Sequence, residues 1–141
     1  MADLYALELA LDLDAATPQW VLDLVARHLT PEPDGDAYAD ASDDWDEGPE
    51  GAYAVNVLQG RGPAYRVGGT CHADLTRTPD GWRLTARQEI HAEIRPDVEY
   101  FLAALAPHVP GPAGPVGSLR FYEDPDPEPI VLDAAGAIRL P

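Results

Sequence analysis

Two histidines and two carboxylates alternate along two neighbouring segments of the chain, in a pattern that could hold a divalent metal ion. His72 and Asp74 are two residues apart, and so are Glu89 and His91. Side chains two residues apart on a strand share one face, and directly opposed side chains on adjacent strands have Cβ atoms about 4.5–5.5 Å apart. Imidazole and carboxylate groups are ligands for zinc and similar ions. These four residues therefore form a candidate metal or small-ligand site, and no cofactor is predicted apart from the divalent cation that such a site could hold.

The same four residues also have a simpler interpretation, as part of a solvated sheet face. Arg83 and Arg87 are expected on that face as well. Ion pairs or polar contacts such as Asp74–Arg87 and His72–Glu89 are typical of a sheet surface that faces water. Because alternating polar residues are common on exposed strands, this interpretation is favoured over the metal site.

A strongly acidic segment at about 32–51 is a second candidate site. It contains nine acidic residues and no basic residue, and aromatic side chains lie within it and at its border. Carboxylates steer basic partners, and aromatic side chains supply much of the binding energy of protein interfaces. The segment is suited to docking on a basic protein surface, but a merely solubilising loop is the favoured interpretation of its composition. Loose binding of a hard cation at 43–47 is a further alternative. The candidate partner-binding residues are Tyr38, Asp43, Asp44, Trp45, Asp46 and Glu47.

Other common chemistries lack their motifs in this chain. A calcium loop beginning at Asp34 would need glycine at its sixth position and glutamate at its twelfth, where the chain has Ala39 and Trp45. The only serines, Ser42 and Ser118, lie outside any G-x-S-x-G elbow. Cys71 falls on the inward side of an expected strand, where a free cysteine behaves as a small hydrophobe. No catalytic residue is predicted, which favours a non-enzymatic role.

The charge of the chain excludes several classes of partner. Among its 141 residues are 25 acidic and nine basic ones, all nine of them arginine, for a net charge of −16. Such a surface repels nucleic-acid phosphates and anionic membranes, so neither is an expected partner. No apolar run approaches the roughly 18 residues of a spanning helix, and the first residues are acidic rather than basic. With a single cysteine, the expected location is the cytoplasm.

The periodicity of apolar residues predicts the elements that position these sites. Alternation with a period of two indicates strands, and spacings of three and four residues indicate helices. Thr17-Pro18 and Pro96 mark the starts of the two helices, because proline suits the first helical turn. The expected helices are 18–29 and the segment that Pro96 opens. The expected strands are 4–13, 52–59, 67–75, 82–90, 119–122 and 130–132, with an acidic, proline-rich loop at 123–129 and a short terminal strand.

This order, β-α-β-β-β-α-β followed by a C-terminal hairpin, predicts one α+β domain over residues 1–141. We expect a two-layer sandwich, ferredoxin-like in outline, with a mostly antiparallel sheet, two helices on one face and an acidic insertion at 32–51. The best-supported function is a protein-binding module of the inhibitor, antitoxin or immunity type. The alternatives are metal or small-ligand binding on the uncovered sheet face, and a homodimer formed through that face.

Overall fold

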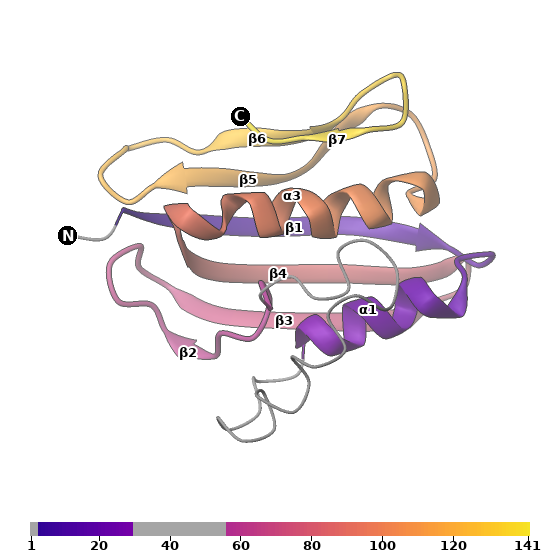
Figure 1. The fold of residues 1–141 in the computed structure, drawn as a ribbon, viewed down its shortest axis with the longest axis horizontal. Coiled ribbons are helices and arrows are strands. Elements are labelled where there is room, and N and C mark those ends of the chain that lie inside the picture. Colours follow the sequence, from indigo (N-terminus) through magenta and orange to yellow (C-terminus); the bar gives the residue numbers. More distant parts are fainter. Residues whose placement is uncertain (1–2, 30–55) are drawn as a thin grey trace, which may run out of the picture.

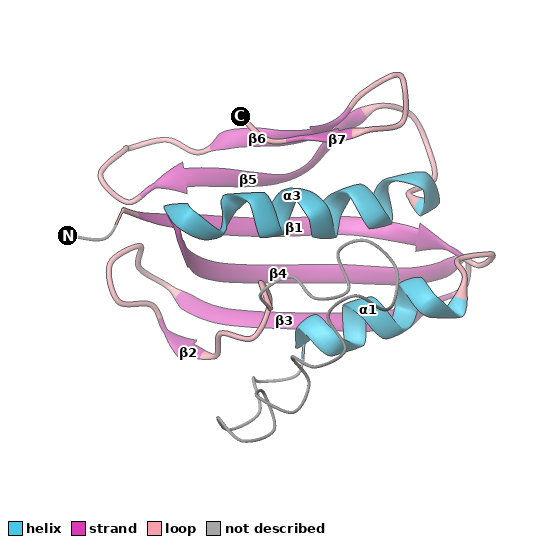
Figure 2. Cartoon of the chain, in the orientation of Figure 1, coloured by secondary structure: helices cyan, strands magenta, loops and turns pink. Residues whose placement is uncertain are grey.

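The computed structural model describes residues 3–29 and 56–141. Those residues form seven strands and two α-helices, labelled in Figure 1 and distinguished by type in Figure 2. The helices are α1 (Gln19–Leu29) and α3 (Arg95–Leu105), and the 3₁₀ turns η2 (Ala92–Ile94) and η3 (Ala106–His108) flank α3. The strands are β1 (Leu4–Asp14), β2 (Gly62–Pro63), β3 (Thr70–Thr78), β4 (Gly81–His91), β5 (Gly114–Phe121), β6 (Glu128–Leu132) and β7 (Ile138–Arg139).

The seven described strands form one sheet in the order β2-β3-β4-β1-β5-β6-β7. All their pairings are antiparallel. Both helices lie on the same face of the sheet (Figure 1), so the expected α+β two-layer architecture is confirmed. Strand β1 is antiparallel to both of its neighbours, β4 and β5, and the ferredoxin-like outline stays a prediction.

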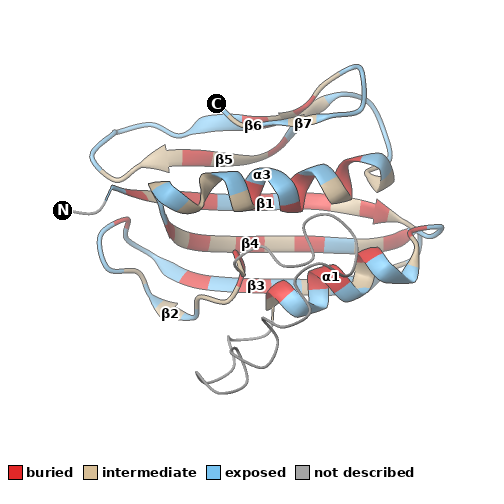
Figure 3. Ribbon diagram, viewed as in Figure 1, coloured by how far each residue is buried: buried red, intermediate tan, exposed pale blue. Residues whose placement is uncertain are grey.

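The core lies between the sheet and the two helices. Strand β1 alternates as expected: its odd-numbered leucines are buried toward the helices, and Glu8 is exposed on the other side. The two helices contribute matching apolar stripes, which bury their apolar area against the sheet. Figure 3 shows these buried positions along β1, β4 and the sheet-facing sides of the helices. The helical residues buried there are Val21, Leu24, Val25, His28, Val98, Phe101, Leu102 and Leu105.

One expected strand is absent from the described part of the chain. Residues 56–59 are irregular, and the rest of the segment expected at 52–59 lies outside the described residues. Val57 and Leu58 are nonetheless buried in the main core, and the Val57 N–H donates to His28 Nδ1 at 3.1 Å. Val57 and Leu58 therefore pack in the core beside α1 as part of a loop, instead of pairing in the sheet.

Strand β5 is longer than expected, since it begins at Gly114 rather than at 119. Its first half carries glycine and proline, which argue against a strand in sequence terms. The pairing with β1 begins at Gly117, opposite Leu9, where the absence of a side chain lets the two backbones approach closely. A bulge between Pro115 and Gly117 carries the pairing with β6 past this point.

Candidate functional site

The structure places the four candidate metal ligands in a register that differs from the expected one. His72 lies opposite Arg87, and Asp74 lies opposite Thr85. The pairs Asp74–Arg87 and His72–Glu89 are therefore not directly opposed. His72 Nδ1 is 3.9 Å from Asp74 Oδ2, and both side chains are largely exposed.

The other two candidate ligands lie elsewhere on the same sheet face. His91 pairs with Leu4 of β1, four residues along β4 from the position opposite His72. That separation corresponds to about 13 Å of strand. Among residues 3–29 and 56–141, no group of three or more His, Cys, Asp or Glu side chains could hold a metal ion. The structure thus brings His72 to Asp74 but does not gather all four residues.

Glu89 holds a loop of the chain instead. Its carboxylate accepts three backbone N–H groups, from Tyr65 (2.8 Å), Arg66 (2.5 Å) and Val67 (3.0 Å). Burial raises the pKa of Glu89, but the three backbone donors and the nearby His91 together bring it below its ordinary value. Glu89 is therefore the anchor of this loop.

Two arginines and a small apolar cluster complete this anchorage. Arg87 Nη2 donates to the Gly68 carbonyl at 2.9 Å, and Arg120 Nη2 donates to the Val67 carbonyl at 2.8 Å. The Val67 side chain is buried against Leu4 and Ala6, on the sheet face opposite the helices. The expectation that Val67 begins a strand is therefore wrong, because β3 begins only at Thr70.

Glu89→Gln is expected to release this loop. The amide has one oxygen for three N–H donors and presents its own NH₂ group to the others, so backbone donors of the loop lose their partner. We expect a loss of about 1–3 kcal/mol in the free energy of unfolding at pH 7. Urea unfolding measures the loss, and amide hydrogen exchange at Tyr65–Val67 should accelerate.

The matched control for Glu89→Gln is Glu99→Gln, which removes the same charge from an exposed position on α3. It should leave both readouts unchanged. Because the pKa of Glu89 is lowered in the folded protein, the stabilisation is present above the ordinary glutamate pKa and is lost as the pH falls through the folded value. Unchanged exchange at 65–67 in Glu89→Gln would show that the carboxylate does not hold the loop.

The anchored loop presents a tyrosine to solvent. Tyr65 is 79% exposed. The Arg66 guanidinium lies 5.2 Å from the Tyr65 ring and 5.6 Å from the Tyr122 ring, so the arginine bridges the loop and the end of β5. Tyrosine combines a large apolar ring with a polar hydroxyl group, and it is enriched at protein interfaces for that reason.

An acidic loop lies beside this tyrosine. Residues 123–129, which run from the end of β5 into the first two residues of β6, are all exposed. Arg120 Nη1 fixes this segment by donating to the Asp124 carbonyl at 2.9 Å. Within the described parts of the chain, none of the four carboxylates of this loop forms an ion pair. They belong to Glu123, Asp124, Asp126 and Glu128.

These features share one end of the sheet, which we call the loop end: residues 64–69, Asp3 and residues 122–128. In Figure 1 it lies at the left, where β1 begins and the loop before β3 and the loop after β5 come together. The Tyr122 N–H donates to the Leu4 carbonyl at 2.9 Å, and this bond connects the segment after β5 to the start of β1. The loop end combines an exposed aromatic side chain with carboxylates that form no ion pair within the described residues. The sequence predicted the same combination for the 32–51 segment.

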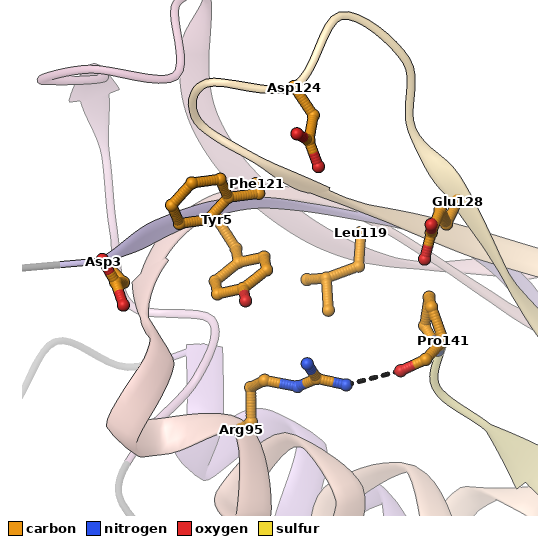
Figure 4. Close-up of a pocket in the computed structure, with 8 residues that line it drawn as sticks. All are labelled: Asp3, Tyr5, Arg95, Leu119, Phe121, Asp124, Glu128 and Pro141. Carbon is orange, nitrogen blue, oxygen red and sulfur yellow. Dashed lines mark hydrogen bonds between the residues drawn. The ribbon is translucent and has the colours of Figure 1, made fainter.

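A hollow of about 360 Å³ opens on the helix side of the loop end (Figure 4). Tyr5 and Phe121 contribute aromatic rings whose centroids are 5.3 Å apart in an edge-to-face contact. Arg95, from the start of α3, reaches across the hollow, where its Nη2 donates to the Pro141 carbonyl at 2.7 Å. Its other lining residues are Asp3, Leu119, Asp124 and Glu128.

The sequence-predicted partner-binding residues lie outside the described residues. They are Tyr38, Asp43, Asp44, Trp45, Asp46 and Glu47. Sequence reasoning did not identify Tyr65 or Arg95 as candidates. The sequence signal that could have identified Tyr65 is its position between two glycine-containing pairs, Gly62-Pro63 and Gly68-Gly69. Such pairs are typical of turns, and they isolate one aromatic residue on a short segment.

Comparison with known proteins gives no relative for this chain. No protein-family model, no curated protein and no solved structure matches it. None of the described helices is long and apolar enough to cross a membrane.

Proposed function

We propose that this protein is a non-enzymatic binding module that engages a basic surface of another protein through the loop end. The observation that carries the proposal is Tyr65, which is 79% exposed on a loop held by three hydrogen bonds to Glu89. Interface energy concentrates in tyrosine, tryptophan and arginine side chains. A loop whose backbone is already held in place loses less entropy on binding than a free one, so the anchored loop favours recognition.

The charge distribution supports a basic partner. Three arginines form ion pairs with carboxylates among the described residues: Arg83 with Asp12, Arg87 with Glu8 and Arg139 with Asp133. The carboxylates of the 123–128 loop have no such pairing there and remain available to steer a positively charged protein. A second copy of this chain, with the same negative charge of −16, would instead be repelled.

The acidic segment at 32–51 extends the same proposal. Like the loop end, it contains both carboxylates and aromatic side chains. We propose that both regions contribute to one electrostatic field that speeds association, with the 32–51 carboxylates acting mainly on the association rate. An inhibitor, antitoxin or immunity-type protein acts in this way, by occupying a basic partner without catalysis.

The test begins with capture of basic proteins from a lysate of the source organism, followed by affinity measurement with the purified partner. Tyr65→Ser is expected to weaken binding by roughly 30-fold, the effect of losing an interface residue worth about 2 kcal/mol. Glu123→Gln with Asp126→Asn should lower the association rate and reduce its dependence on salt. Unfolding by urea checks that each variant is folded.

Two control variants match these changes in chemistry. Tyr100→Ser removes a tyrosine that is 50% exposed on α3, away from the loop end. Asp80→Asn with Glu99→Gln removes two exposed charges elsewhere on the described surface. Both should bind as the unaltered protein does. Equal affinity of Tyr65→Ser and Tyr100→Ser for the captured partner would overturn the proposal.

A further inference from the structure

We propose that the hollow beside Arg95 receives an arginine side chain of the partner. This inference rests on the proposed function, since it identifies the chemical group by which the basic surface is recognised. The hollow lies at the loop end, and Asp124 belongs to both the acidic loop and the hollow's lining. A side chain inserted here would therefore be continuous with a contact at Tyr65.

The lining carries an excess of negative charge. Asp3 precedes β1, whereas Asp124 and Glu128 belong to one segment after β5, and the three carboxylates lie on three sides of the hollow (Figure 4). Arg95 is the single cation among its eight lining residues. One further positive charge is therefore electrostatically favourable, whereas an anion would meet three carboxylates.

The Arg95 side chain lines the hollow but does not fill it. Its Nη2 is directed to the Pro141 carbonyl at 2.7 Å, and the remaining open volume is about 360 Å³. That volume lies at the lower end of the roughly 300–1,000 Å³ range of small-molecule pockets, so it suits one side chain rather than a large cofactor.

The geometry favours a guanidinium group over a metal ion or an ammonium group. The described residues contain no group of carboxylates close enough together to hold a metal ion. Separated carboxylates suit a planar group with five N–H donors, which can bond in several directions and stack on aromatic rings. The guanidinium of Arg95 lies 5.6 Å from the Tyr5 ring, so this ring already accommodates the same chemistry from within the chain.

The experiment is a titration of the ¹⁵N-labelled full chain with N-acetyl-arginine-methylamide, followed by NMR. N-acetyl-lysine-methylamide and N-acetyl-glycine-methylamide serve as probes of charge alone and of the backbone alone. We expect saturable shifts of the Tyr5, Leu119 and Phe121 amides at millimolar arginine derivative, with several-fold weaker binding of the lysine derivative and none of the glycine derivative.

Asp124→Asn with Glu128→Gln should weaken binding of the arginine derivative by about tenfold, because two charge-assisted hydrogen bonds become neutral ones. Asp80→Asn with Glu99→Gln should leave it unchanged. Absence of saturable shifts at the hollow, or equal binding of the arginine and lysine derivatives, would overturn the inference. If no saturable shifts appeared at the hollow but Tyr65→Ser weakened binding of the captured partner, only the arginine pocket would be overturned. If the arginine derivative bound at the hollow but Tyr65→Ser left binding of the partner unchanged, only the proposed function would be overturned.

Discussion

Lowering the pH from 7 to 4 is expected to remove about 3 kcal/mol from the free energy of unfolding through His28 alone. Burial, followed by the charge of Arg27, lowers the pKa of His28 from 6.5 to about 4 in the folded protein. Between these two values the unfolded chain binds a proton that the folded protein does not. The stabilisation is therefore complete above pH 6.5 and is lost progressively as the pH falls through 4.

The surroundings of His28 explain this shift. The side chain is 1% exposed and packs against the Phe101 ring at a centroid distance of 4.5 Å. Its Nδ1 accepts the Val57 N–H, so the neutral ring carries its proton on Nε2, which has no hydrogen-bond partner among the described residues. Protonation of Nδ1 would break the bond to Val57 and bury an unpaired charge.

The measurement compares urea unfolding of the protein and of His28→Asn at pH 7, 6 and 5. The asparagine side-chain oxygen can take the place of Nδ1 as the acceptor for Val57, so the variant should fold while lacking a titrating group. We expect its free energy of unfolding to be lower at pH 7, because ring contacts with Phe101 are lost, but to vary much less with pH.

His72→Asn is the matched control, because His72 is exposed on β3 and its removal leaves the buried imidazole in place. This variant should keep the pH dependence of the unaltered protein. If His28→Asn and His72→Asn showed the same slope between pH 7 and pH 5, the buried histidine would not be its source.

Gly117→Ala is expected to destabilise the protein by about 3 kcal/mol or more, at the upper end of the cost of overpacking. A Cβ at this position would overlap the carbonyl oxygen of Glu8 and press against Leu9 Cδ2 at 3.1 Å. Backbone atoms in the centre of a sheet cannot move aside as a flexible side chain can. The change should therefore separate β5 from β1 and, with it, displace the acidic loop that follows β5.

Gly114→Ala tests whether this effect comes from the close approach rather than from glycine itself. Gly114 begins the same strand, but a Cβ there would meet no atom within 4 Å. Urea unfolding should show a change of less than about 0.5 kcal/mol for Gly114→Ala, as for other unconstrained surface sites. A comparable loss in both variants would contradict the proposed role of Gly117.

The sequence alone determined the elements whose signal is local. The alternating leucines of β1, the proline-led starts of the helices and the turn at Pro79-Asp80 are confirmed in the structure. Each depends on the backbone period of a strand or helix or on the allowed dihedral angles of a few consecutive residues. The charge of −16 likewise follows from composition and needs no fold.

Tertiary structure alone decided the partners of individual side chains. Val57 belongs to a segment expected as a strand, yet it and Leu58 pack as a loop beside His28, because burial in the core satisfies them without pairing. Glu89 resembles a metal ligand by spacing, but its carboxylate meets N–H groups more than 20 residues earlier in the chain. Spacing fixes the face on which a side chain lies, whereas the group it meets depends on how distant segments cross, and that is why Tyr65 and the hollow beside Arg95 emerge only from the folded chain.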